Sequence, residues 1–437
     1  MQVIKRDCTE VDFDKAKIYN AIIKSMPNGN GVKKHIAETI ANEIESELNN
    51  DDESIDIYSI ESMVFDKLIK HKQKLTAKSY EGYRQIREFQ RDIQNSTDRD
   101  LLSLLSGTNN YYNKENSNKN AQLVTTQRDY MAGIISKDIS DRNLLPPDVI
   151  QADKEGIIHF HDKDYFGQKT LHNCDLINLE DMLQNGTVVN GVMIERPHRF
   201  HTACTIATQI ITAVASSQYG GATISLSHLA PFVRDSYNKF YNKYIRWGFD
   251  EIQSAKFAKI DLEEDIKDGV QTFNYQINSM ATTNGQAPFL SVFMYLGETD
   301  EYKNELAMII EEFLNQRIVG IKNKVGVYVT QSFPKLLYVL EENNINKDSK
   351  YYYLTELSAK CTAKRLVPDY ISEKKMKELK EGNCFPNMGC RSFLSPYKDI
   401  NGNYKFYGRF NQGVITLNLV DIALSSNKEI DKFWELM

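Results

Sequence analysis

The sequence predicts an α/β protein in three parts: a small helical domain over residues 1–92, a polar linker over 93–120, and an α/β body over 121–437. Three observations support this division. Apolar residues recur at helical spacing through the first part, and an Asn-rich segment without apolar period follows it. Beyond that segment, short strand-like apolar runs alternate with long helical stretches, which is typical of an α/β sheet, either open or closed into a barrel.

Composition and charge exclude several classes of protein. The chain has 437 residues, of which 41% are hydrophobic and 26% are charged, an ordinary globular composition. Its net charge of −6 argues against a nucleic-acid partner. No apolar run reaches the roughly 18 residues of a membrane span, and none follows Met1, so neither a membrane partner nor a signal peptide is predicted.

The six cysteines are scattered, and none belongs to a C-x-x-C pair. A disulfide scaffold and a zinc ribbon are therefore not expected, and a reducing cytoplasmic compartment is predicted. Isolated thiols are by default small buried apolar residues. The six are Cys8, Cys174, Cys204, Cys361, Cys384 and Cys390.

In the N-terminal domain, the pattern predicts two short strands around a turn, over 3–7 and 11–13, followed by four helices. Asp14 is a suitable N-cap for the first helix because its carboxylate can accept from the free backbone N–H groups. Apolar residues at steps of three or four predict the other helices. These span about 36–48, 57–68 and 76–92.

In the body, Leu145-Pro-Pro-Asp precedes a helix, since proline favours the first helical turn. Small apolar residues over 205–216 predict a tightly packed helix, and 156–161 predicts a short buried strand. Two further strands are expected over 289–295 and 413–419.

The N-terminal domain also contains basic residues that an antiparallel bundle would bring to one end. A fixed cluster of cations suits a triphosphate, with arginine giving bidentate contacts. The alternative from periodicity alone is a solvated basic face. The residues concerned are Lys5, Arg6, Lys17, Arg84 and Arg87.

Three motifs in this domain favour a nucleotide site over a solvated basic face. They are Val3-x-Lys-Arg-Asp, Phe13-Asp-x-x-Lys-Ile and Tyr80-x-x-Tyr-Arg-x-x-Arg87. Together they resemble the ATP-cone, a module that senses ATP against dATP in ribonucleotide reductases. Cys8 stands where the family's hairpin usually has glycine. The nucleotide contacts that the resemblance implies are Val3, Lys5, Arg6, Lys17, Glu61, Arg84 and Arg87.

Two cysteines lie in distinctive surroundings. Cys390 follows Gly389 between turn residues, which suits a loop tip that projects a thiol. Cys174 follows a segment with His159 and His161, which on a strand would share one face. The two histidines suggest a metal pair without an evident third ligand. Taken alone, each of these residues is also compatible with a structural role.

Six segments in order along the body resemble the anaerobic (class III) ribonucleoside-triphosphate reductase large chain, a glycyl-radical enzyme. The resemblance implies a ten-stranded α/β barrel. The segments are Thr126-Gln-Arg-Asp-Tyr-Met-Ala-Gly, Gly156-Ile-Ile-His-Phe-His-Asp, Gln218-Tyr-Gly-Gly, Thr283-Asn-Gly-Gln-Ala-Pro-Phe, Met388-Gly-Cys-Arg-Ser-Phe-Leu-Ser and Gly408-Arg-Phe-Asn-Gln-Gly-Val.

The resemblance implies radical chemistry on ribonucleoside triphosphates. Cys390 would become the thiyl radical that abstracts the ribose 3′-hydrogen, and Cys174 would supply a hydrogen at the 2′ position. Asn411 would bind the ribose hydroxyls without titrating. Ser392 would lie near the substrate and formate, the expected reductant. His159 and His161 are second-rank candidates at the same mouth.

An effector site is also implied, at which dNTP or ATP binds in a homodimer interface. Its candidates are Gln209, Glu195 and His198, the last at a position where a lysine can serve phosphate. Magnesium would accompany the nucleotides, and a radical-SAM enzyme would activate the protein. No metal site is expected in this chain.

The family's zinc-binding cysteines and its glycyl-radical loop, Arg-x-Cys-Gly-Tyr-x-Gly, do not occur in the sequence. The barrel is therefore expected to be incomplete, with zinc and the glycyl radical on a separate or missing C-terminal piece. The last residues, 428–437, predict an amphipathic helix whose apolar face needs a partner.

Two functions remain open: a reductase part that such a piece completes, or a non-catalytic nucleotide-sensing and dimerising remnant. A third class, a formate-lyase type of glycyl-radical enzyme, is disfavoured by the ATP-cone and by Met388-Gly-Cys-Arg-Ser-Phe.

Overall fold

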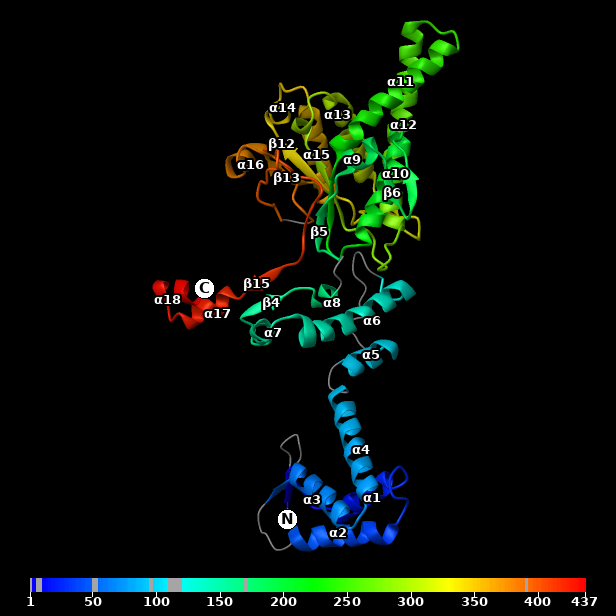
Figure 1. Cartoon of the computed structure of the whole chain (residues 1–437). Helices are drawn as coiled ribbons and strands as arrows, with labels where there is room; N and C mark the ends of the chain where they lie inside the picture. The colour runs from blue at the N-terminus through cyan, green and yellow to red at the C-terminus, as the bar shows by residue number, and fades with distance from the viewer. Residues whose placement is uncertain are drawn as a thin grey trace. The chain divides into compact units, whose positions relative to one another are not determined.

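The computed structural model describes residues 2–4, 10–48, 54–93, 97–108, 120–167, 171–389 and 392–437, with 85–93 described by backbone alone. The chain divides into two compact units, 1–102 and 103–437 (Figure 1). Each unit has its own apolar core.

The N-terminal unit packs four helices beside a three-stranded sheet. Strand β1 (Gln2–Ile4) pairs antiparallel with β2 (Glu10–Asp12) and parallel with β3 (Ile55–Asp56). The helices are α1 (Lys15–Ser25), α2 (Lys34–Leu48), α3 (Ile57–Lys70) and α4 (Lys74–Ile93). The two predicted strands and the four predicted helices are confirmed. Strand β3 was not predicted, because two residues are too few to show an alternation of apolar and polar side chains.

Capping and burial explain these helices. The Asp14 carboxylate accepts from the N–H of Ala16 at 2.9 Å and so caps α1, as predicted. Ile22, Ile40 and Leu68 are fully buried. Each lies three or four residues from another buried apolar residue of its own helix, so these residues form one apolar face. A further helix, α5 (Thr97–Leu105), lies within the range predicted as linker.

The second unit is built on a six-stranded sheet in the order β13-β12-β9-β8-β5-β14. The first five strands are mutually parallel, and β14 is antiparallel to β5. The strands are β5 (Cys174–Leu176), β8 (Ala222–Ser225), β9 (Leu290–Met294), β12 (Lys335–Leu340), β13 (Asp369–Ser372) and β14 (Arg409–Asn411).

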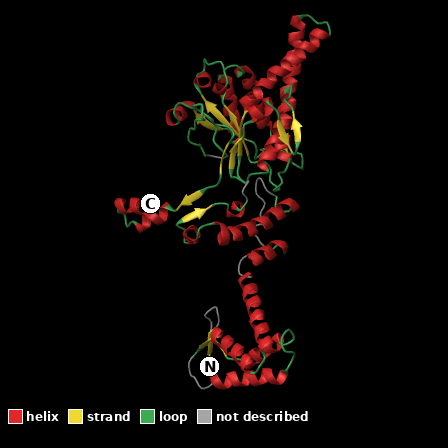
Figure 2. Ribbon diagram, viewed as in Figure 1, coloured by secondary structure: helices red, strands yellow, loops and turns green. Residues whose placement is uncertain are grey.

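Helices join successive parallel strands and flank the sheet (Figure 2). Every residue of β8 and β9 is buried, and β9, Leu-Ser-Val-Phe-Met, has the nearly continuous apolar sequence of a strand covered on both faces. The main connecting helices are α10 (Phe200–Ala215), α11 (Ala230–Arg246), α12 (Glu251–Ser279), α13 (Lys303–Val319) and α15 (Tyr352–Arg365). The α/β class is confirmed, and six strands in the described residues fall short of a closed ten-stranded barrel, as expected for an incomplete one.

Shorter elements complete the unit. The helices are α6 (Val124–Ile139), α7 (Pro147–Lys154), α8 (Lys163–Phe166), α9 (Leu179–Gln184), α14 (Glu342–Ile345), α16 (Glu373–Leu379), α17 (Leu419–Ser425) and α18 (Ile430–Leu436). The strands are β4 (Ile158–Phe160), β6 (Thr187–Val189), β7 (Val192–Ile194), β10 (Ile321–Lys322), β11 (Tyr328–Val329) and β15 (Ile415–Leu417).

One strand prediction was wrong in its burial. Strand β4 forms within 156–161, but its residues are partly or fully exposed. It pairs with β15 in a separate two-stranded sheet, outside the six-stranded one. The helices that cover the two faces of the larger sheet therefore do not bury β4. The predicted C-terminal amphipathic helix is confirmed as α18, with Ile430 and Trp434 exposed. None of the helices in the described part of the chain combines the length and apolarity of a membrane span.

An ion pair between a partly exposed arginine and a buried aspartate joins three of the connecting helices. Arg199, before α10, donates from Nε to the Asp265 carboxylate of α12 at 2.5 Å, and Ser236 of α11 donates to the same carboxylate at 2.7 Å. The Ser236 hydroxyl in turn accepts from the N–H of Phe200 at 2.8 Å. The Asp265 side chain is fully buried, so its carboxylate depends on Arg199 and Ser236 for hydrogen bonds, and these contacts link the three helices.

A second buried polar cluster lies at the carboxyl ends of the strands. The Glu298 carboxylate accepts from Ser225, Ser227 and Tyr407, and burial raises the pKa of Glu298. The His228 ring packs edge-on against Tyr407 with ring centroids 4.4 Å apart. Burial lowers the pKa of His228 to about 3.

His228 predicts an acid sensitivity of folding. The native state keeps the ring neutral, while the unfolded chain takes up a proton below its pKa of 6.5. The free energy of unfolding therefore falls through this group by about 1 kcal/mol between pH 6.5 and 5.5, and by about 1.4 kcal/mol for each pH unit further below. Urea unfolding at pH 6.5 and 5.5, followed by tryptophan fluorescence, should show a change that is more destabilising in the wild type than in His228→Phe by this amount, because the variant loses this contribution. His198→Phe, at an exposed histidine of the same unit, should keep it; equal slopes in all three proteins would contradict the assignment.

Candidate active site

Cys174 opens strand β5, and its closest partner in the sheet is Asn411 of β14. The N–H of Cys174 donates to the Asn411 Oδ1 at 2.8 Å, and the N–H of Asn173 donates to the Asn411 backbone oxygen at 2.9 Å. The antiparallel register thus brings together two predicted site residues that are 237 positions apart in the chain.

Three glycines surround the Cys174 sulfur. A Cβ atom at Gly220 would lie 2.6 Å from the Cys174 Sγ, and one at Gly389 would lie 2.8 Å from it. A Cβ atom at Gly221 would lie 3.0 Å from the Gly389 Cα. The N–H of Gly221 also donates to the sulfur at 3.2 Å. Only glycine allows backbone to approach the thiol this closely, which accounts for the Gly-Gly of the Gln218-Tyr-Gly-Gly motif.

Gly389 lies at the end of the loop that leads to Cys390. Its φ of +59° favours glycine, and its carbonyl accepts from the Ser291 Oγ at 3.0 Å and from the Asn387 Nδ2 at 3.1 Å. The N–H of Met388 donates to the Ser392 backbone oxygen at 2.7 Å, and Ser392 itself is exposed. Cys390 and Arg391 lie outside the described residues. The structure therefore places the residue preceding Cys390 against Cys174.

Tyr219 is a neighbour of this site to which the sequence analysis gave no role. Its ring stacks on Tyr165 with centroids 4.9 Å apart, and its hydroxyl donates to the Gln412 carbonyl at 3.0 Å. Tyr165 in turn donates to Asp129 at 2.7 Å. The motif Gln218-Tyr-Gly-Gly contained the signal, but only the fold shows that Tyr219 ties the end of β14 to the start of the body.

A contact between a histidine and a carboxylate lies beside Cys174 at the start of β5. The His172 Nε2 contacts the Asp175 carboxylate at 2.7 Å, and both side chains are largely buried. Burial raises the pKa of Asp175 to about 6, although the contact with His172 works in the opposite direction. Sequence reasoning missed this pair, since three residues of separation in an irregular segment give no periodic signal.

His159 and His161 lie together but not on Cys174. Their rings meet edge-on with centroids 4.3 Å apart, and the His161 Nε2 lies 2.7 Å from the Thr416 Oγ1. Neither makes a hydrogen bond or ion pair with Cys174. No group of three metal-ligating side chains occurs among the residues that the structure describes, so the donor set for a metal is not found there.

The predicted nucleotide residues of the N-terminal unit are described in part. Arg84 of α4 lies 3.7 Å from the Glu61 carboxylate of α3, and the Glu61 side chain is only 12% exposed. Val3 is buried in β1, and Lys17 is exposed on α1. Lys5, Arg6 and Cys8 lie outside the described residues, as does the side chain of Arg87.

The predicted effector residues lie in the segment before α10 and within this helix. Glu195 and His198 are exposed just before this helix, and Gln209 is exposed on it. The neighbouring Arg196 is held by Asp235 at 2.8 Å and stacks over Phe232. The remaining described thiols, Cys204, Cys361 and Cys384, lie in apolar or half-buried positions, and burial raises the pKa of each.

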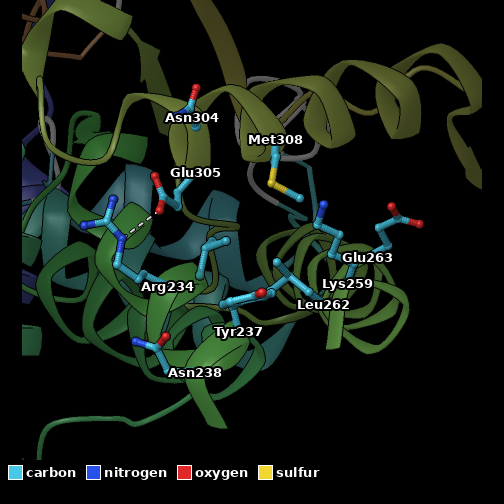
Figure 3. A pocket seen from close by; sticks show the side chains of 10 residues that line it. Arg234, Tyr237, Asn238, Lys259, Leu262, Glu263, Asn304, Glu305 and Met308 are labelled. Atoms are coloured by element: carbon cyan, nitrogen blue, oxygen red, sulfur yellow. Dashed lines mark hydrogen bonds and ion pairs between the residues drawn. The ribbon is translucent and has the colours of Figure 1, made fainter. Parts of the chain in front are cut away.

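A pocket of about 440 Å³ opens between α11, α12 and α13 (Figure 3). Val233, Leu262 and Met308 give it apolar walls, and Arg234 is held there by Glu305 at 2.7 Å. None of the residues predicted from the sequence for the active, cone or effector sites lines this pocket.

Two family models match the chain. One, described as anaerobic ribonucleoside-triphosphate reductase, matches residues 115–437, and the other, described as the ATP cone domain, matches residues 1–89. Among solved structures, the anaerobic ribonucleotide reductase from Thermotoga maritima in complex with dATP and CTP has a TM-score of 0.52 at 13% identity. That similarity covers 77% of this chain and 55% of the other, and it shows the fold.

Curated relatives agree with the family models. The anaerobic ribonucleoside-triphosphate reductase of Salmonella typhimurium is 34% identical over 439 residues, which covers 100% of this chain and 60% of the relative. The protein of that name from Enterobacteria phage T4 is 38% identical over 334 residues, which covers 75% of this chain and 53% of the relative. The chain thus spans about 60% of the length of its bacterial relatives. It belongs to the anaerobic ribonucleoside-triphosphate reductase family.

Proposed function

We propose that this chain supplies the substrate-binding and thiol part of an anaerobic ribonucleoside-triphosphate reductase, with a C-terminal piece supplying the glycyl radical. The observation that supports this most strongly is the arrangement of Cys174, Asn411 and Gly389. It joins three segments that are far apart in sequence around a single sulfur atom. Packing alone does not require a thiol beside the backbone of Gly220, Gly221 and Gly389.

The proposed chemistry uses two thiols on opposite sides of a ribose. The glycyl radical, when present, supplies the unpaired electron that makes Cys390 a thiyl radical. Cys390 then takes the 3′-hydrogen atom of the substrate, so that an S–H bond forms and a C3′–H bond breaks. The 2′-hydroxyl takes up a proton and leaves as water, and Cys174 delivers a hydrogen atom to C2′, which leaves the unpaired electron on the Cys174 sulfur. Formate then supplies the two electrons, one hydrogen atom returns to the Cys174 sulfur, and Cys390 gives its hydrogen atom back to C3′ and is again a thiyl radical. Formate is the proposed reductant, and the net reaction consumes formate and a proton and yields deoxynucleotide, carbon dioxide and water.

Asn411 is proposed to hold the ribose. Its Oδ1 is already occupied by the N–H of Cys174, while its Nδ2 has no hydrogen-bond partner among the described residues. Those two N–H groups are free to donate to ribose hydroxyls beside the Cys174 sulfur. An amide does not titrate, so this contact is independent of pH. Ser392 is proposed as a neighbour of substrate and formate because it closes the turn that contains Cys390.

The proposed partners follow from the same assignment. Magnesium nucleoside triphosphates are the substrates, and a radical-SAM enzyme is the activator. Effectors bind at Glu195, His198 and Gln209 in a homodimer, and His159 and His161 line the mouth of the site. The proposed location is the reducing cytoplasm, where free thiols persist.

Reconstitution tests the proposal. This chain is mixed anaerobically with a fragment that corresponds to the C-terminal 40% or so of a bacterial relative, together with activating enzyme, ATP, CTP and formate. We expect dCTP to form only when both polypeptides are present. Omission of either one is the control. Binding of the fragment and radical formation without any dCTP would contradict a catalytic role for this chain.

The second candidate function, a nucleotide-sensing remnant, is favoured by the contact between Glu61 and Arg84. A buried carboxylate facing a guanidinium gives one acceptor for ribose or base and one donor for phosphate in adjacent positions. This function needs no thiol chemistry, and it predicts ATP and dATP binding by the chain alone.

Arg84→Ala is expected to weaken ATP binding about tenfold, since it removes a charge-assisted hydrogen bond to phosphate. Isothermal titration of ATP into the chain measures the change. Lys78→Ala on the same helix removes an exposed cation that is not among the predicted contacts, and it should bind ATP like the wild type. ATP binding of Arg84→Ala at wild-type strength would exclude Arg84 from the nucleotide site.

A further inference from the structure

We infer that Asn173 is a positioning residue that orients the S–H bond of Cys174, from which the proposed reaction takes the hydrogen atom for C2′. The inference rests on the proposed function, because the direction of this bond matters only if Cys174 gives up its hydrogen. Asn173 was not among the residues predicted from the sequence.

The side-chain oxygen of Asn173 faces the Cys174 sulfur. The S–H group of Cys174 donates to the Asn173 Oδ1 at 2.7 Å. The same sulfur accepts from the N–H of Gly221 at 3.2 Å. A thiol carries one hydrogen, and the contact with Gly221 already contains the hydrogen of the peptide N–H. The two contacts together therefore direct the thiol hydrogen toward Asn173.

A second contact of the Asn173 amide fixes which of its ends faces the sulfur. Burial raises the pKa of Tyr219, and a hydrogen bond from the Asn173 side chain to the Tyr219 hydroxyl works in the opposite direction. This hydroxyl gives its single hydrogen to the Gln412 carbonyl at 3.0 Å, so toward Asn173 its oxygen can only accept. The Nδ2 of Asn173 therefore faces Tyr219, which leaves the acceptor Oδ1 on the sulfur.

The backbone of Asn173 is held independently of its side chain. Its N–H donates to the Asn411 carbonyl at 2.9 Å, and its carbonyl accepts from the N–H of Gly220 at 2.7 Å. An apolar side chain would leave both contacts in place. The residue is only 8% exposed, and a buried amide costs free energy unless it is hydrogen-bonded. Packing of the segment thus does not account for an amide at this position, whereas its contacts with the thiol and Tyr219 do.

A held S–H bond suits the transfer of a hydrogen atom. A thiol without a partner rotates among three staggered positions about its Cβ–Sγ bond. A hydrogen bond to a neutral acceptor is strong enough to favour one position and weak enough to be given up when the hydrogen moves. In that step the S–H bond breaks, the C2′–H bond forms and the unpaired electron stays on the sulfur until formate chemistry restores the thiol. Asn173 acts through Cys174 and needs no contact of its own with the substrate.

The infrared S–H stretching band measures this contact without any catalysis, because hydrogen bonding lowers its frequency. The spectrum of the full chain is recorded anaerobically, and the spectrum of Cys174→Ser is subtracted from it. The difference isolates the band of Cys174 from those of the other five cysteines. Each further variant is compared in the same way with its own Cys174→Ser double variant.

Asn173→Leu keeps the size of the side chain without the acceptor and should raise the frequency of the Cys174 band. Asn173→Asp keeps the acceptor oxygen and adds charge, so it should lower the frequency further, and it serves if Asn173→Leu fails to fold. Asn185→Leu is the matched control, since its exposed amide donates to Asp181 and contacts no thiol. It should leave the band at the wild-type frequency.

The reconstituted mixture then tests the role of the contact. Asn173→Leu should lower kcat for dCTP formation about fivefold and leave KM for CTP unchanged, since the amide touches the thiol and not the substrate. A wild-type frequency in both Asn173 variants, or a wild-type kcat in Asn173→Leu, would overturn the positioning role while dCTP formation by the wild type upheld the proposed function. Absence of dCTP from the wild-type mixture would overturn both.

Discussion

Cys174→Ser and Cys390→Ser should each reduce dCTP formation by the reconstituted enzyme to background, a loss on the order of 10³-fold or more. Each substitution keeps the shape of the side chain and replaces a weak S–H bond by a strong O–H bond, so hydrogen-atom transfer is blocked at that position. For Cys174→Ser the hydroxyl also fits the pocket of glycines, so the fold is expected to persist. Product is measured by chromatography of the nucleotides after a fixed time.

The control for this experiment is Cys384→Ser. Cys384 is a partly buried thiol outside the proposed site. Burial and the nearby Glu373 carboxylate raise the pKa of the Cys384 thiol to about 12. The Cys384→Ser variant should retain most of the activity. Full dCTP formation by Cys390→Ser would show that the thiyl assignment is wrong, and full formation by Cys174→Ser would remove this residue from the chemistry.

Asp265→Ala should destabilise the second unit by about 1–3 kcal/mol. The substitution leaves the buried Ser236 hydroxyl without its acceptor and Arg199, whose side chain is 40% exposed, without its carboxylate. A buried donor left without its partner costs about 1–3 kcal/mol. Urea unfolding followed by tryptophan fluorescence measures the effect, since both tryptophans, Trp247 and Trp434, belong to this unit.

Asp268→Ala is the matched control. It removes an exposed carboxylate three residues further along α12, and its free energy of unfolding should stay within about 0.5 kcal/mol of the wild type. If the two variants were equally stable, the buried network would contribute nothing to the packing of α10, α11 and α12.

The sequence predicted those elements of the fold whose apolar residues recur at a regular spacing or form a continuous run. Helices with an apolar step of three or four residues, such as α2 and α3, and the fully buried strand β9 were found from the sequence. The misses have physical reasons. Strand β3 has two residues, too few for any period, and β4 has an apolar sequence but pairs only with β15. Burial depends on which layer covers a strand, and that is set by segments distant in sequence.

The candidate site was likewise predicted in part from the sequence. Motifs pointed to Cys174 and Asn411, and the structure joins them through a hydrogen bond. The motifs did not reveal Ser291, because a serine within an apolar strand has no pattern of its own. They also left Tyr219 without a role, since its stacking on Tyr165 depends on how α8 and the segment before β8 meet. Contacts between side chains of different segments require the fold.

The pairing of β14 with β5 has a consequence for the geometry of the candidate site. Strand β14 has three residues and lies at the edge of the sheet, paired through Asn411 to Cys174. Side chains alternate between the faces of a strand, so a slip of one residue would replace Asn411 by Phe410 or Gln412. Such a slip would remove the Asn411 amide from the Cys174 N–H, so the geometry of the candidate site depends on the register of a short edge strand. A polypeptide that bound this edge only in the native register would stabilise that register by mass action.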